Sequence, residues 1–564
     1  MRLKEVMRGC DYTPSLTLPP RGGGLGEGDM DISGVAYDSR KVKENCLFVA
    51  ITGERYDGHD FIKDVIEGGA AAIVYERNIN ETGKGRMGET GTYSPVLRVS
   101  DSPSPLPLYI SVKNTRKALA CIANNFYGRP SDRLTLIGIT GTNGKTTTTY
   151  ILKSILESWG KEVGLIGTIQ YLIKDRVYPA LHTTPESLEF QGLLKDIFLS
   201  GCTHVISEVS SHALAQYRVD GAGFKTAVFT NLTGDHLDFH KTMEDYFRAK
   251  ERLFRELLNK DGTSVINLDD PYGRSLVSSL VAFCRSQNIL TYGLETGADI
   301  MAVDIDNSFQ GLRFKILFRG RNYDISSHLI GQPNVYNIMS AVGVSISLGV
   351  PWQVILKGIE KAGNVTGRFE KVDIGQGFLC IIDYAHSEDA LERLICTARE
   401  LTLPPHPPLT KGGYRGGDSS PRIITVFGCG GDRDRGKRPR MGAVATRLSD
   451  FVIITSDNPR SEEPADIIKE IEGGIVSKNY LIEPYRREAI MKAVDMADDG
   501  DIVLIAGKGH EDYQEIKGVR YRFNDRDVIE GAIKDKLQRK DSGSQGVKNA
   551  GKKLLDPSTP FSST

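Results

Sequence analysis

The sequence predicts an α/β protein in which mostly parallel sheets are covered by helices. Short apolar runs typical of buried strands alternate with helical patterns, at residues 46–51, 70–75, 203–207, 227–231, 423–427, 451–455 and 502–506. The chain has 564 residues and 40% hydrophobic content, which is too long for one core. In such folds ligands bind beyond the carboxyl ends of the strands, so the loops after these runs are the first candidates for a site.

We divide the chain into three domains and a tail. The domains are residues 1–133, 134–363 and 364–540, and the Lys/Ser/Gly-rich tail at 541–564 is expected to be disordered. Two segments, near 16–29 and 401–421, both begin LTLPP and become rich in glycine, which indicates low-complexity surface insertions. A Pro-rich ligand for a partner is the alternative function of these segments. A further long loop is expected at 78–104.

Charge and composition exclude several classes of protein. The 71 Lys and Arg against 72 Asp and Glu leave a net charge of −1, which does not favour nucleic acid or an anionic membrane surface. The 8 cysteines include no Cys-x-x-Cys pair, so neither a disulfide framework nor a structural zinc site is expected. No stretch resembles a signal peptide or approaches the roughly 20 apolar residues of a membrane helix. We expect a soluble, cytoplasmic enzyme that is a monomer.

Residues 134–157 contain the clearest functional motif. An apolar run at 134–139 is followed by a loop with Gly141 and Gly144, then Lys145, a threonine run and a helical pattern. Backbone N–H groups of such a loop surround a phosphate, the lysine adds a point charge and the Thr146 hydroxyl can hold Mg²⁺. The position five before Gly144 is Ile139, so the spacing predicts a shorter variant of the phosphate loop. A chance Gly/Thr turn is the structural alternative.

Two further polar residues follow apolar runs of the same domain. Glu208 stands in SEVSSHAL and His236 in NLTGDHLDFH. A carboxylate and an imidazole at strand ends beside a phosphate loop could complete the shell of a Mg²⁺ ion. Either residue could instead be a hydrogen-bonded structural group in its loop.

Together the motifs resemble those of the Mur ligase family. They are GTNGKTT at 141–147, HTTPE at 182–186, EVSSHAL at 208–214, NLTGDHLDFH at 231–240, DYAH at 383–386, GCGGDRDRGKRP at 428–439, DNPR at 457–460 and GKGHEDYQ at 507–514. The resemblance covers the chain except the insertions and the tail. It implies an N-terminal UDP-binding domain, a central P-loop ATPase domain and a C-terminal Rossmann-like domain that binds an amino acid.

The activity that this resemblance implies is an ATP-dependent amide ligation in peptidoglycan precursor synthesis. The enzyme would add meso-2,6-diaminopimelate to UDP-N-acetylmuramoyl-L-alanyl-D-glutamate, with ATP and Mg²⁺. The substrate carboxylate attacks the γ-phosphate and gives an acyl phosphate, which the incoming amine then attacks. Phosphorylation is needed because a carboxylate is a poor electrophile, and Lys145 and Mg²⁺ neutralise the triphosphate.

The resemblance also assigns residues of the nucleotide site. The metal would be held by Thr146, Glu208, His236 and Lys250, with Lys250 as an N-carboxylate. From its own neighbourhood, FRAKERLF, Lys250 is an ordinary lysine on a helix surface. The residues along the nucleotide would be Gly141, Thr142, Asn143, Gly144, Lys145, Thr146, Thr147, Asn334, Asn337, Arg368 and Asp383. The two asparagines could also cap a helix expected at 335–348.

The nucleotide-sugar end of the muramyl substrate has its own matching positions. These are Ser39, Glu54, Arg55 and Tyr56 in the first domain and His182, Thr183, Thr184, Ser210, Gln216 and Arg218 in the second. His182 stands where the family pattern has asparagine. Because histidine can still donate one hydrogen bond, we expect altered binding and not loss of binding.

The carboxy-terminal motifs bear on the choice of amino acid. The positions matching a diaminopimelate site are Arg433, Asp457, Asn458, Pro459, Arg460, Gly507 and Glu511. Diaminopimelate has a distal carboxylate that an arginine can bind, whereas lysine has none. An arginine left unpaired by lysine would cost a few kcal/mol, of order a hundredfold in discrimination. The structural alternative for Arg460 is a surface salt bridge to Glu462 or Glu463.

Three other functions stay open at this point. One is a lysine-adding ligase of the same family, and another is a folylpolyglutamate synthase, which the DSR segment of the first domain and DNPR disfavour. The third is a catalytically silent nucleotide-binding regulator. The presence of Lys145, Glu208, His236 and Lys250 argues against the regulator.

Overall fold

The computed structural model describes residues 1–14, 30–53, 56–76, 107–234, 237–283, 288–402 and 421–552, with the backbone alone at 237–238 and 541–552. The predicted insertion at 16–29 and the predicted loop at 78–104 lie outside these residues, as does nearly all of the insertion at 401–421. The chain divides into two compact units. The first is Met1–Lys145, Leu156–Thr291 and Gly343–Val350, and the second is Thr146–Ile155, Tyr292–Val342 and Pro351–Thr564.

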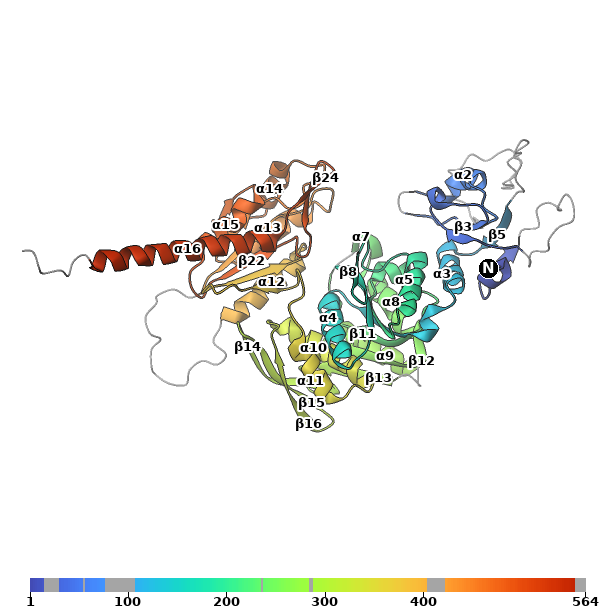
Figure 1. Ribbon diagram of the computed structural model, residues 1–564, viewed down its shortest axis with the longest axis horizontal. Helices are drawn as coiled ribbons and strands as arrows, with labels where there is room; N and C mark the ends of the chain where they lie inside the picture. The colour runs from blue at the N-terminus through green and yellow to red at the C-terminus, as the bar shows by residue number, and fades with distance from the viewer. Residues whose placement is uncertain are drawn as a thin grey trace, which may run out of the picture. The chain divides into compact units, whose positions relative to one another are not determined.

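The first unit begins with a five-stranded sheet. Its strand order is β1 (Tyr12–Pro14), β5 (Leu108–Val112), β4 (Ala72–Glu76), β3 (Cys46–Val49) and β2 (Gly34–Ala36), and all neighbours except β1 and β5 are parallel. The helices here are α1 (Leu3–Val6), α2 (Ile62–Glu67) and α3 (Thr115–Phe126) (Figure 1). Strands β3 and β4 correspond to the runs predicted at 46–51 and 70–75.

The second sheet of this unit carries the phosphate loop. The strands of this sheet that lie wholly in the first unit have the order β12 (Leu258–Asn267), β11 (Phe224–Phe229), β6 (Thr135–Thr140), β10 (His204–Glu208), β7 (Val163–Ile166), β8 (Gln170–Ile173) and β9 (Arg176–Pro179). The strands are parallel from β12 to β7, and β8 and β9 add an antiparallel edge. The central strands are buried on both faces, as their continuous apolar runs predict.

Helices of the first unit pack against this sheet. They are α5 (Ser187–Leu199), α6 (Ser211–Ala215), α8 (Met243–Arg255) and α9 (Pro271–Phe283), and the short α7 (Leu237–His240) contacts α8. Their apolar side chains join those of the strands in one core that includes Phe190, Leu214, Phe229 and Phe254. The loops after β6, β10 and β11 therefore leave the same edge of a rigid sheet, which is the edge where ligands of such folds bind.

The second unit contains three antiparallel strands that the sequence did not predict. Strands β14 (Ile300–Ser308), β15 (Gly311–Phe318) and β16 (Arg321–Ser327) form two hairpins, and the last residues of β13 (Asn288–Gly293) pair with β14 in parallel. Helix α10 (Gln332–Ser347) and helix α11 (Trp352–Lys361) follow. Trp352 of α11 stacks on Tyr323 of β16, with ring centroids 3.6 Å apart.

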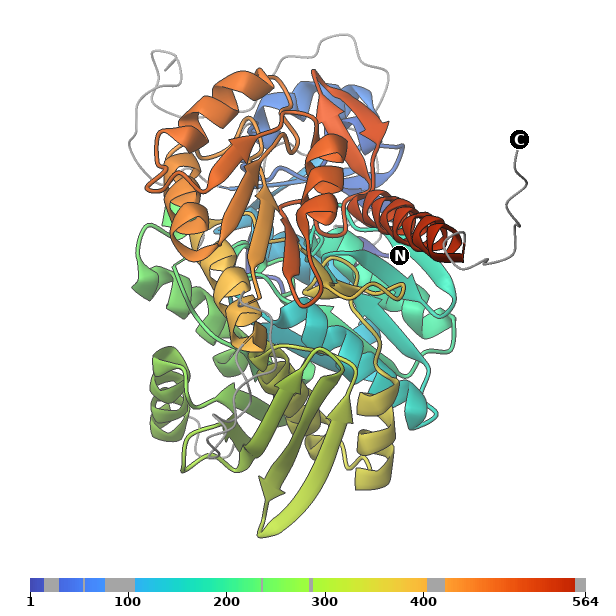
Figure 2. The ribbon, with the colours of Figure 1, turned by 90° about the vertical axis from the view of Figure 1, so that its left-hand side faces the viewer.

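The C-terminal part has a six-stranded sheet that is parallel except at one edge. The order is β17 (Glu370–Val372), β18 (Leu379–Asp383), β22 (Ile502–Ala506), β19 (Ile423–Phe427), β20 (Phe451–Ile454) and β21 (Tyr480–Ile482), with β17 antiparallel. Helices α12 (Glu388–Thr402), α13 (Lys437–Leu448) and α14 (Pro464–Glu472) share one core with the sheet, and α15 (Arg486–Met496) and α16 (Asp525–Lys552) share another. Strands β23 (Tyr513–Ile516) and β24 (Val519–Arg522) form a separate two-stranded hairpin. Figure 2 shows α16, in red, extending beyond this sheet.

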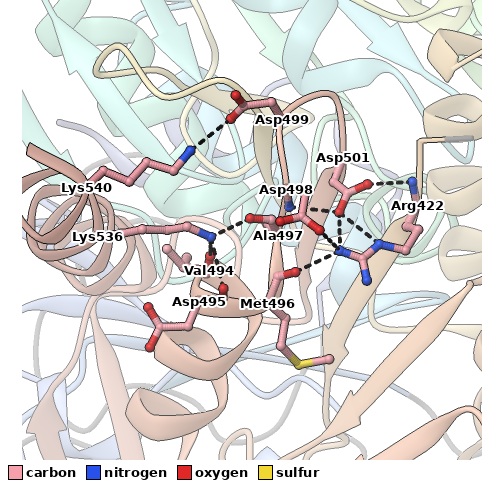
Figure 3. Close-up of polar contacts among 10 residues, drawn as sticks. All are labelled: Arg422, Val494, Asp495, Met496, Ala497, Asp498, Asp499, Asp501, Lys536 and Lys540. Carbon is pink, nitrogen blue, oxygen red and sulfur yellow. Dashed lines mark hydrogen bonds and ion pairs between the residues drawn. The ribbon is translucent and has the colours of Figure 1, made fainter. Parts of the chain in front are cut away.

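Helix α16 is held against the C-terminal end of α15 by a lysine. Lys536 Nζ donates to the carbonyl oxygens of Val494 at 2.8 Å, Asp495 at 2.9 Å and Ala497 (Figure 3). The last carbonyls of a helix lack partners within the helix and favour a cation. Lys536 supplies both the hydrogen-bond donor and the positive charge at the end of α15.

The backbone of helix α16 continues to Lys552, and residues 553–564 lie outside the description. A helix already formed and packed extends at little cost, because only nucleation is unfavourable. The expected disorder of the tail stays a prediction. Among the residues described, no helix is long and apolar enough to cross a membrane.

Candidate functional site

The phosphate loop lies between β6 and helix α4 (Lys145–Ser158). Gly141 has φ of +146°, and a Cβ there would lie 1.9 Å from Thr230 Oγ1, so no larger residue fits. The loop is tied to the segment after β11. Asn143 N donates to Asn231 Oδ1 at 2.9 Å, and Thr230 Oγ1 donates to the Asn143 carbonyl at 2.6 Å. These bonds fix the loop backbone before any ligand binds.

Two cations converge on the same loop. Lys145 Nζ donates to the carbonyl oxygens of Gly141 at 3.1 Å and Thr142 at 2.9 Å. Lys250 Nζ, from α8, donates to the Gly141 carbonyl at 2.9 Å. Thr146 and Thr147 are buried in the first turn of α4. The helix N-terminus and the lysines together make this loop a strongly anion-attracting place.

The interpretation of Lys250 as a plain surface lysine is wrong. Its side chain is 1% exposed, and its Nζ lies 4.5 Å from the centroid of the Tyr246 ring. The Tyr246 hydroxyl lies 3.2 Å from Thr142 Oγ1, so α8 contacts the loop through two side chains one turn apart. Tyr246 was not among the predicted residues, although its position four residues before Lys250 places both on one helix face.

Glu208 ends β10 and is fully buried. Its Oε1 accepts from Thr168 N at 2.9 Å and its Oε2 accepts from Thr168 Oγ1 at 3.0 Å. His236 lies outside the described residues, so its position relative to Glu208 stays a prediction. Within the described ranges, no group of three or more His, Cys, Asp and Glu side chains forms a metal cluster.

The residues predicted for the muramyl peptide lie together beside Glu208. Thr184 Oγ1 donates to the Glu208 carbonyl at 2.8 Å, and Ser210 N donates to Thr184 Oγ1 at 3.1 Å. Arg218 Nη1 donates to the Thr184 carbonyl at 3.1 Å, and its Nη2 donates to Gln216 Oε1 at 2.7 Å. One connected network therefore includes residues that are far apart in the sequence.

Further hydroxyl, carbonyl and ionic contacts extend this network. Thr183 Oγ1 lies 3.1 Å from Thr168 Oγ1, and the His182 carbonyl accepts from Tyr171 at 2.6 Å. Glu186, which caps α5, pairs with Arg116 at 2.9 Å and lies 3.5 Å from Arg218. Sequence reasoning assigned no role to Arg116, Thr168 or Glu186. Glu186 ends the quoted HTTPE motif, whereas only the fold brings Arg116 and Thr168 to it.

The positions predicted for the uridine end are described in part. Ser39 begins a short 3-10 turn, Ser39–Lys41, that Asp38 caps by accepting from Arg40 N. Tyr56 is 74% exposed, which leaves its ring open to a ligand. Glu54 and Arg55 lie outside the described residues.

In the second unit, the two predicted asparagines lie within α10. Asn334 Nδ2 donates to the Ile330 carbonyl at 2.7 Å, and Asn337 Nδ2 donates to Asn334 Oδ1 at 2.9 Å. Thr148 of α4 donates to Asn337 Oδ1 at 3.4 Å. The expected helix start at 335 is wrong, since α10 begins at Gln332. The asparagines therefore line the first two turns and do not cap the helix.

Arg368 lies just before β17, and Asp383 is the last residue of β18 in the C-terminal sheet. Asp383 Oδ2 accepts from Phe369 N at 2.7 Å, and the Arg368 guanidinium lies 5.0 Å from the centroid of the Tyr384 ring. Burial raises the pKa of Asp383, and the Arg368 charge opposes that rise. His510 packs on Tyr384 with ring centroids 5.1 Å apart, and burial lowers its pKa to about 4. Tyr384 and His510 were not predicted.

The DNPR segment presents an arginine held by the backbone. Arg460 Nη1 donates to the Gly431 carbonyl at 2.7 Å, and Arg460 N donates to the Glu515 carbonyl at 3.0 Å. A Cβ on Gly430 would lie 2.8 Å from Arg460 Nη1 and 3.8 Å from Arg433 Cγ, so both predicted arginines approach Gly430. Pro459 packs directly on Gly431 through its carbonyl oxygen.

The alternative role of Arg460 as a surface salt bridge does not fit this geometry. Glu462 pairs with Arg438 at 2.8 Å, and Glu463 pairs with Lys517 at 2.9 Å. The Glu462–Arg438 pair lowers the pKa of Glu462 to about 2. Both carboxylates that could have held Arg460 are therefore engaged with other cations.

The remaining predicted residues meet next to this arginine segment. Asn458 Nδ2 donates to Glu511 Oε2 at 2.7 Å. Gly507 has φ of +114°, and a Cβ there would lie 2.5 Å from Asp457 Oδ2. Lys508, which was not predicted, contacts both Asn458 and Glu511. This cluster, of residues 457–460 and 507–511, is called the amino-acid cluster below.

Comparison with known domain families agrees with this arrangement. Residues 31–127 match the Mur ligase family catalytic domain, residues 139–345 match the Mur ligase middle domain, and residues 367–509 match the Mur ligase glutamate ligase domain. Together the matched ranges include most of the chain.

Individual proteins are similar over nearly their whole length. A UDP-N-acetylmuramoyl-L-alanyl-D-glutamate–2,6-diaminopimelate ligase of Clostridium tetani is 42% identical over 95% of this chain and 100% of its own. The ligase with the same name from Aquifex aeolicus is 43% identical over 88% of this chain and 93% of its own.

Solved structures lead to the same family. A structure of a UDP-N-acetylmuramoyl-L-alanyl-D-glutamate–2,6-diaminopimelate ligase has a TM-score of 0.63 and 30% identity, covering 95% of this chain and 99% of that chain. A Mycobacterium tuberculosis folylpolyglutamate synthase shares the fold alone, with a TM-score of 0.53, 15% identity and 69% of this chain covered. The chain belongs to the Mur ligase family.

Proposed function

We propose that this chain is the ligase that adds meso-2,6-diaminopimelate to UDP-N-acetylmuramoyl-L-alanyl-D-glutamate with ATP. The observation that carries the choice of amino acid is the segment in which Arg460 donates to the Gly431 carbonyl and Asn458, two residues earlier, donates to Glu511. An arginine and a carboxylate from one such segment and its partner match an amino acid whose far end has a carboxylate and an ammonium. The relatives named for this reaction support the same choice.

The chain's residues fit a nucleoside triphosphate and a divalent cation. Glu208 supplies a fully buried carboxylate, and buried carboxylates are paired or hold metal ions. Thr146 supplies a hydroxyl, and both oxygen donors suit Mg²⁺. We assign His236 and Lys250 to the same role, with Lys250 as a carbamate. When bound, Mg²⁺ would neutralise the charge on the transferring phosphoryl group.

The first step activates the terminal carboxylate of the muramyl dipeptide. Its oxygen forms a bond to the γ-phosphorus, the bond to the β-phosphate oxygen breaks, and ADP leaves. The loop N–H groups and Lys145 stabilise charge on the phosphate oxygens, because they are already fixed in place. Thr183, Thr184, Ser210 and Arg218 would hold the muramyl peptide for this attack.

The second step forms the amide. The substrate amine attacks the acyl phosphate carbonyl, the C–N bond forms and inorganic phosphate leaves. The residues of the amino-acid cluster would orient the amine by binding the far end of the substrate. Orientation of this kind converts binding energy into rate. Lysine lacks the distal carboxylate, so Arg460 would stay unpaired with lysine bound.

A phosphate-release assay tests the proposal. The full chain is given ATP, Mg²⁺ and UDP-N-acetylmuramoyl-L-alanyl-D-glutamate, with diaminopimelate, lysine or no amine. We expect phosphate release with diaminopimelate only, and release that requires the muramyl substrate. Phosphate release with lysine and not with diaminopimelate would support the lysine-adding ligase. The absence of phosphate release from every mixture would support the regulator.

A further inference from the structure

Lys508 lies at the centre of the amino-acid cluster although no substrate role was expected for it. It follows β22 in the turn that begins at Gly507, and its side chain is 0% exposed. Its Nζ donates to Asn458 Oδ1 at 3.0 Å and to Glu511 Oε2 at 3.4 Å. One buried ammonium therefore contacts both residues that we assign to the far end of the amino acid.

We infer that Lys508 is a positioning residue, which fixes the Asn458 amide and keeps the Glu511 carboxylate ionised for the substrate ammonium. The inference rests on the proposed function and names a residue on which its amino-acid recognition depends. The orientation part follows from the hydrogen bonds of Asn458. Because Asn458 Oδ1 accepts from Lys508 and from Glu515 N at 2.9 Å, its Nδ2 must point to Glu511.

The electrostatic part follows from the charges around Lys508. Burial lowers the pKa of Lys508 and Arg486 adds to this shift, whereas the carboxylates of Asp457, Glu511 and Asp525 oppose it. The Tyr513 ring centroid lies 5.5 Å from the Lys508 Nζ. Arg486 forms a bidentate pair with Asp525, at 2.8 and 2.7 Å, so much of its charge is neutralised there.

Glu511 has a similar set of neighbours. Burial raises the pKa of Glu511 and the Asp457 carboxylate adds to the rise, whereas Lys508 and the hydrogen bond from Asn458 oppose it. The Tyr384 hydroxyl also lies within electrostatic range of Glu511. Lys508 is thus a contacting cation that opposes the effect of burial on the Glu511 carboxylate.

Removal of this charge has a consequence that depends on pH. Without Lys508, the pKa of Glu511 rises further, because burial disfavours the charged carboxylate. Below the raised pKa the side chain is neutral and binds an ammonium poorly. Above it the carboxylate is ionised again and binding returns. A residue that only supported the fold would weaken binding equally at every pH.

The test compares Lys508→Met and Lys508→Arg with the wild-type chain. The KM for diaminopimelate and for ATP is measured at a series of pH values, from the lowest to the highest at which the wild-type chain stays active. For Lys508→Met we expect the KM for diaminopimelate to rise on the order of tenfold or more at the lowest pH and much less at the highest pH. The KM for ATP should not change, and Lys508→Arg should restore most of the binding.

Lys536→Met is the matched control. Lys536 is also partly buried in the C-terminal part, but its Nζ binds carbonyl oxygens at the end of α15 (Figure 3). Its loss should leave both KM values unchanged. If Lys508→Met does not fold, Lys508→Gln keeps a donor for Asn458 and removes only the charge, and the same pH dependence is expected of it.

Three outcomes would overturn the inference. The first two are a rise in the KM for diaminopimelate that is the same at every pH and an equal rise in the KM for ATP. In a Lys508→Met, Glu511→Gln double variant the pH dependence should vanish, and its persistence would also contradict the assignment. A wild-type chain that does not use diaminopimelate at all would instead defeat the proposed function.

Discussion

Lys250 Nζ donates a 2.9 Å hydrogen bond to the carbonyl oxygen of Gly141, the first glycine of the phosphate loop. The lysine comes from α8, and its side chain is buried over the Tyr246 ring. The bond joins the nucleotide loop to a helix more than a hundred residues away in the sequence. The Lys250 nitrogen can be an ammonium or part of a carbamate, and these two forms have opposite charge.

Lys250→Ala should reduce turnover on the order of a hundredfold or more, the scale of losing one charged group in a catalytic site. Phosphate release measures the loss. Short carboxylates should restore part of the activity if a carbamate is the working form. Lys225→Ala, which removes an exposed pair with Asp261, is the control and should keep full activity. Rescue by short amines and not by carboxylates would contradict the carbamate assignment.

Gly141→Ala should abolish ATP use. The added methyl group would overlap Thr230 Oγ1, and φ of +146° is strained for alanine, so the loop must move. Binding of ATP to the purified chain, followed by calorimetry, measures the effect. Gly34→Ala, where a Cβ meets nothing within 4 Å, is the control. Normal ATP affinity in Gly141→Ala would show that the loop conformation is unimportant.

Arg460→Ala should raise the KM for diaminopimelate by about a hundredfold, since the distal carboxylate loses its charged partner. The KM for ATP should stay within about twofold. Steady-state kinetics, with diaminopimelate and ATP varied in turn, measures the two KM values separately. Arg447→Ala removes an exposed arginine paired with Glu392 and should change neither value. Equal effects of Arg460→Ala on both substrates would remove Arg460 from the amino-acid site.

Stability should fall with acid in a window set by His204. This histidine is buried against Trp159, and burial lowers its pKa from 6.5 to about 4. Between those values the unfolded chain binds a proton that the folded chain does not, so stability is lost as pH falls. His204→Gln should reduce this loss in urea unfolding, and His328→Gln, an exposed site, should not. An unchanged pH dependence in His204→Gln would contradict the burial argument.

Arg486→Met should destabilise the C-terminal part by about 3–5 kcal/mol, because it leaves the Asp525 carboxylate buried without its partner. Urea unfolding, read from that part of the chain, measures the change. The double variant Arg486→Met, Asp525→Leu should recover most of the stability, since neither charge is then left buried. A double variant no more stable than Arg486→Met would contradict this account of the pair.

Much of the fold was predictable because its central strands are buried on both faces. Continuous apolar runs such as 423–427 and 502–506 became β19 and β22 with the same bounds. The antiparallel strands β14 to β16 were missed, because their alternating exposure gives a weaker pattern. The domain boundaries at 133 and 363 stay a prediction.

The candidate site was predictable where glycine and charge patterns mark it. Gly141, Lys145 and Arg460 could be found in this way, whereas their partners depend on the tertiary fold. The burial of Lys250 comes from packing of α8 on the loop, and the role of Lys508 comes from Asn458, 50 residues earlier. Neither the burial of Lys250 nor the contact of Lys508 with Asn458 could be predicted from a local sequence pattern.

The most direct test of the account is a competition between two amines. The full chain receives ATP, Mg²⁺, UDP-N-acetylmuramoyl-L-alanyl-D-glutamate and equal concentrations of meso-diaminopimelate and lysine, and the products are weighed by mass spectrometry. The account predicts the diaminopimelate tripeptide in large excess, of order a hundredfold, and ADP formed in equal amount to the product. Comparable amounts of the lysine product, or product formed without ATP, would contradict it.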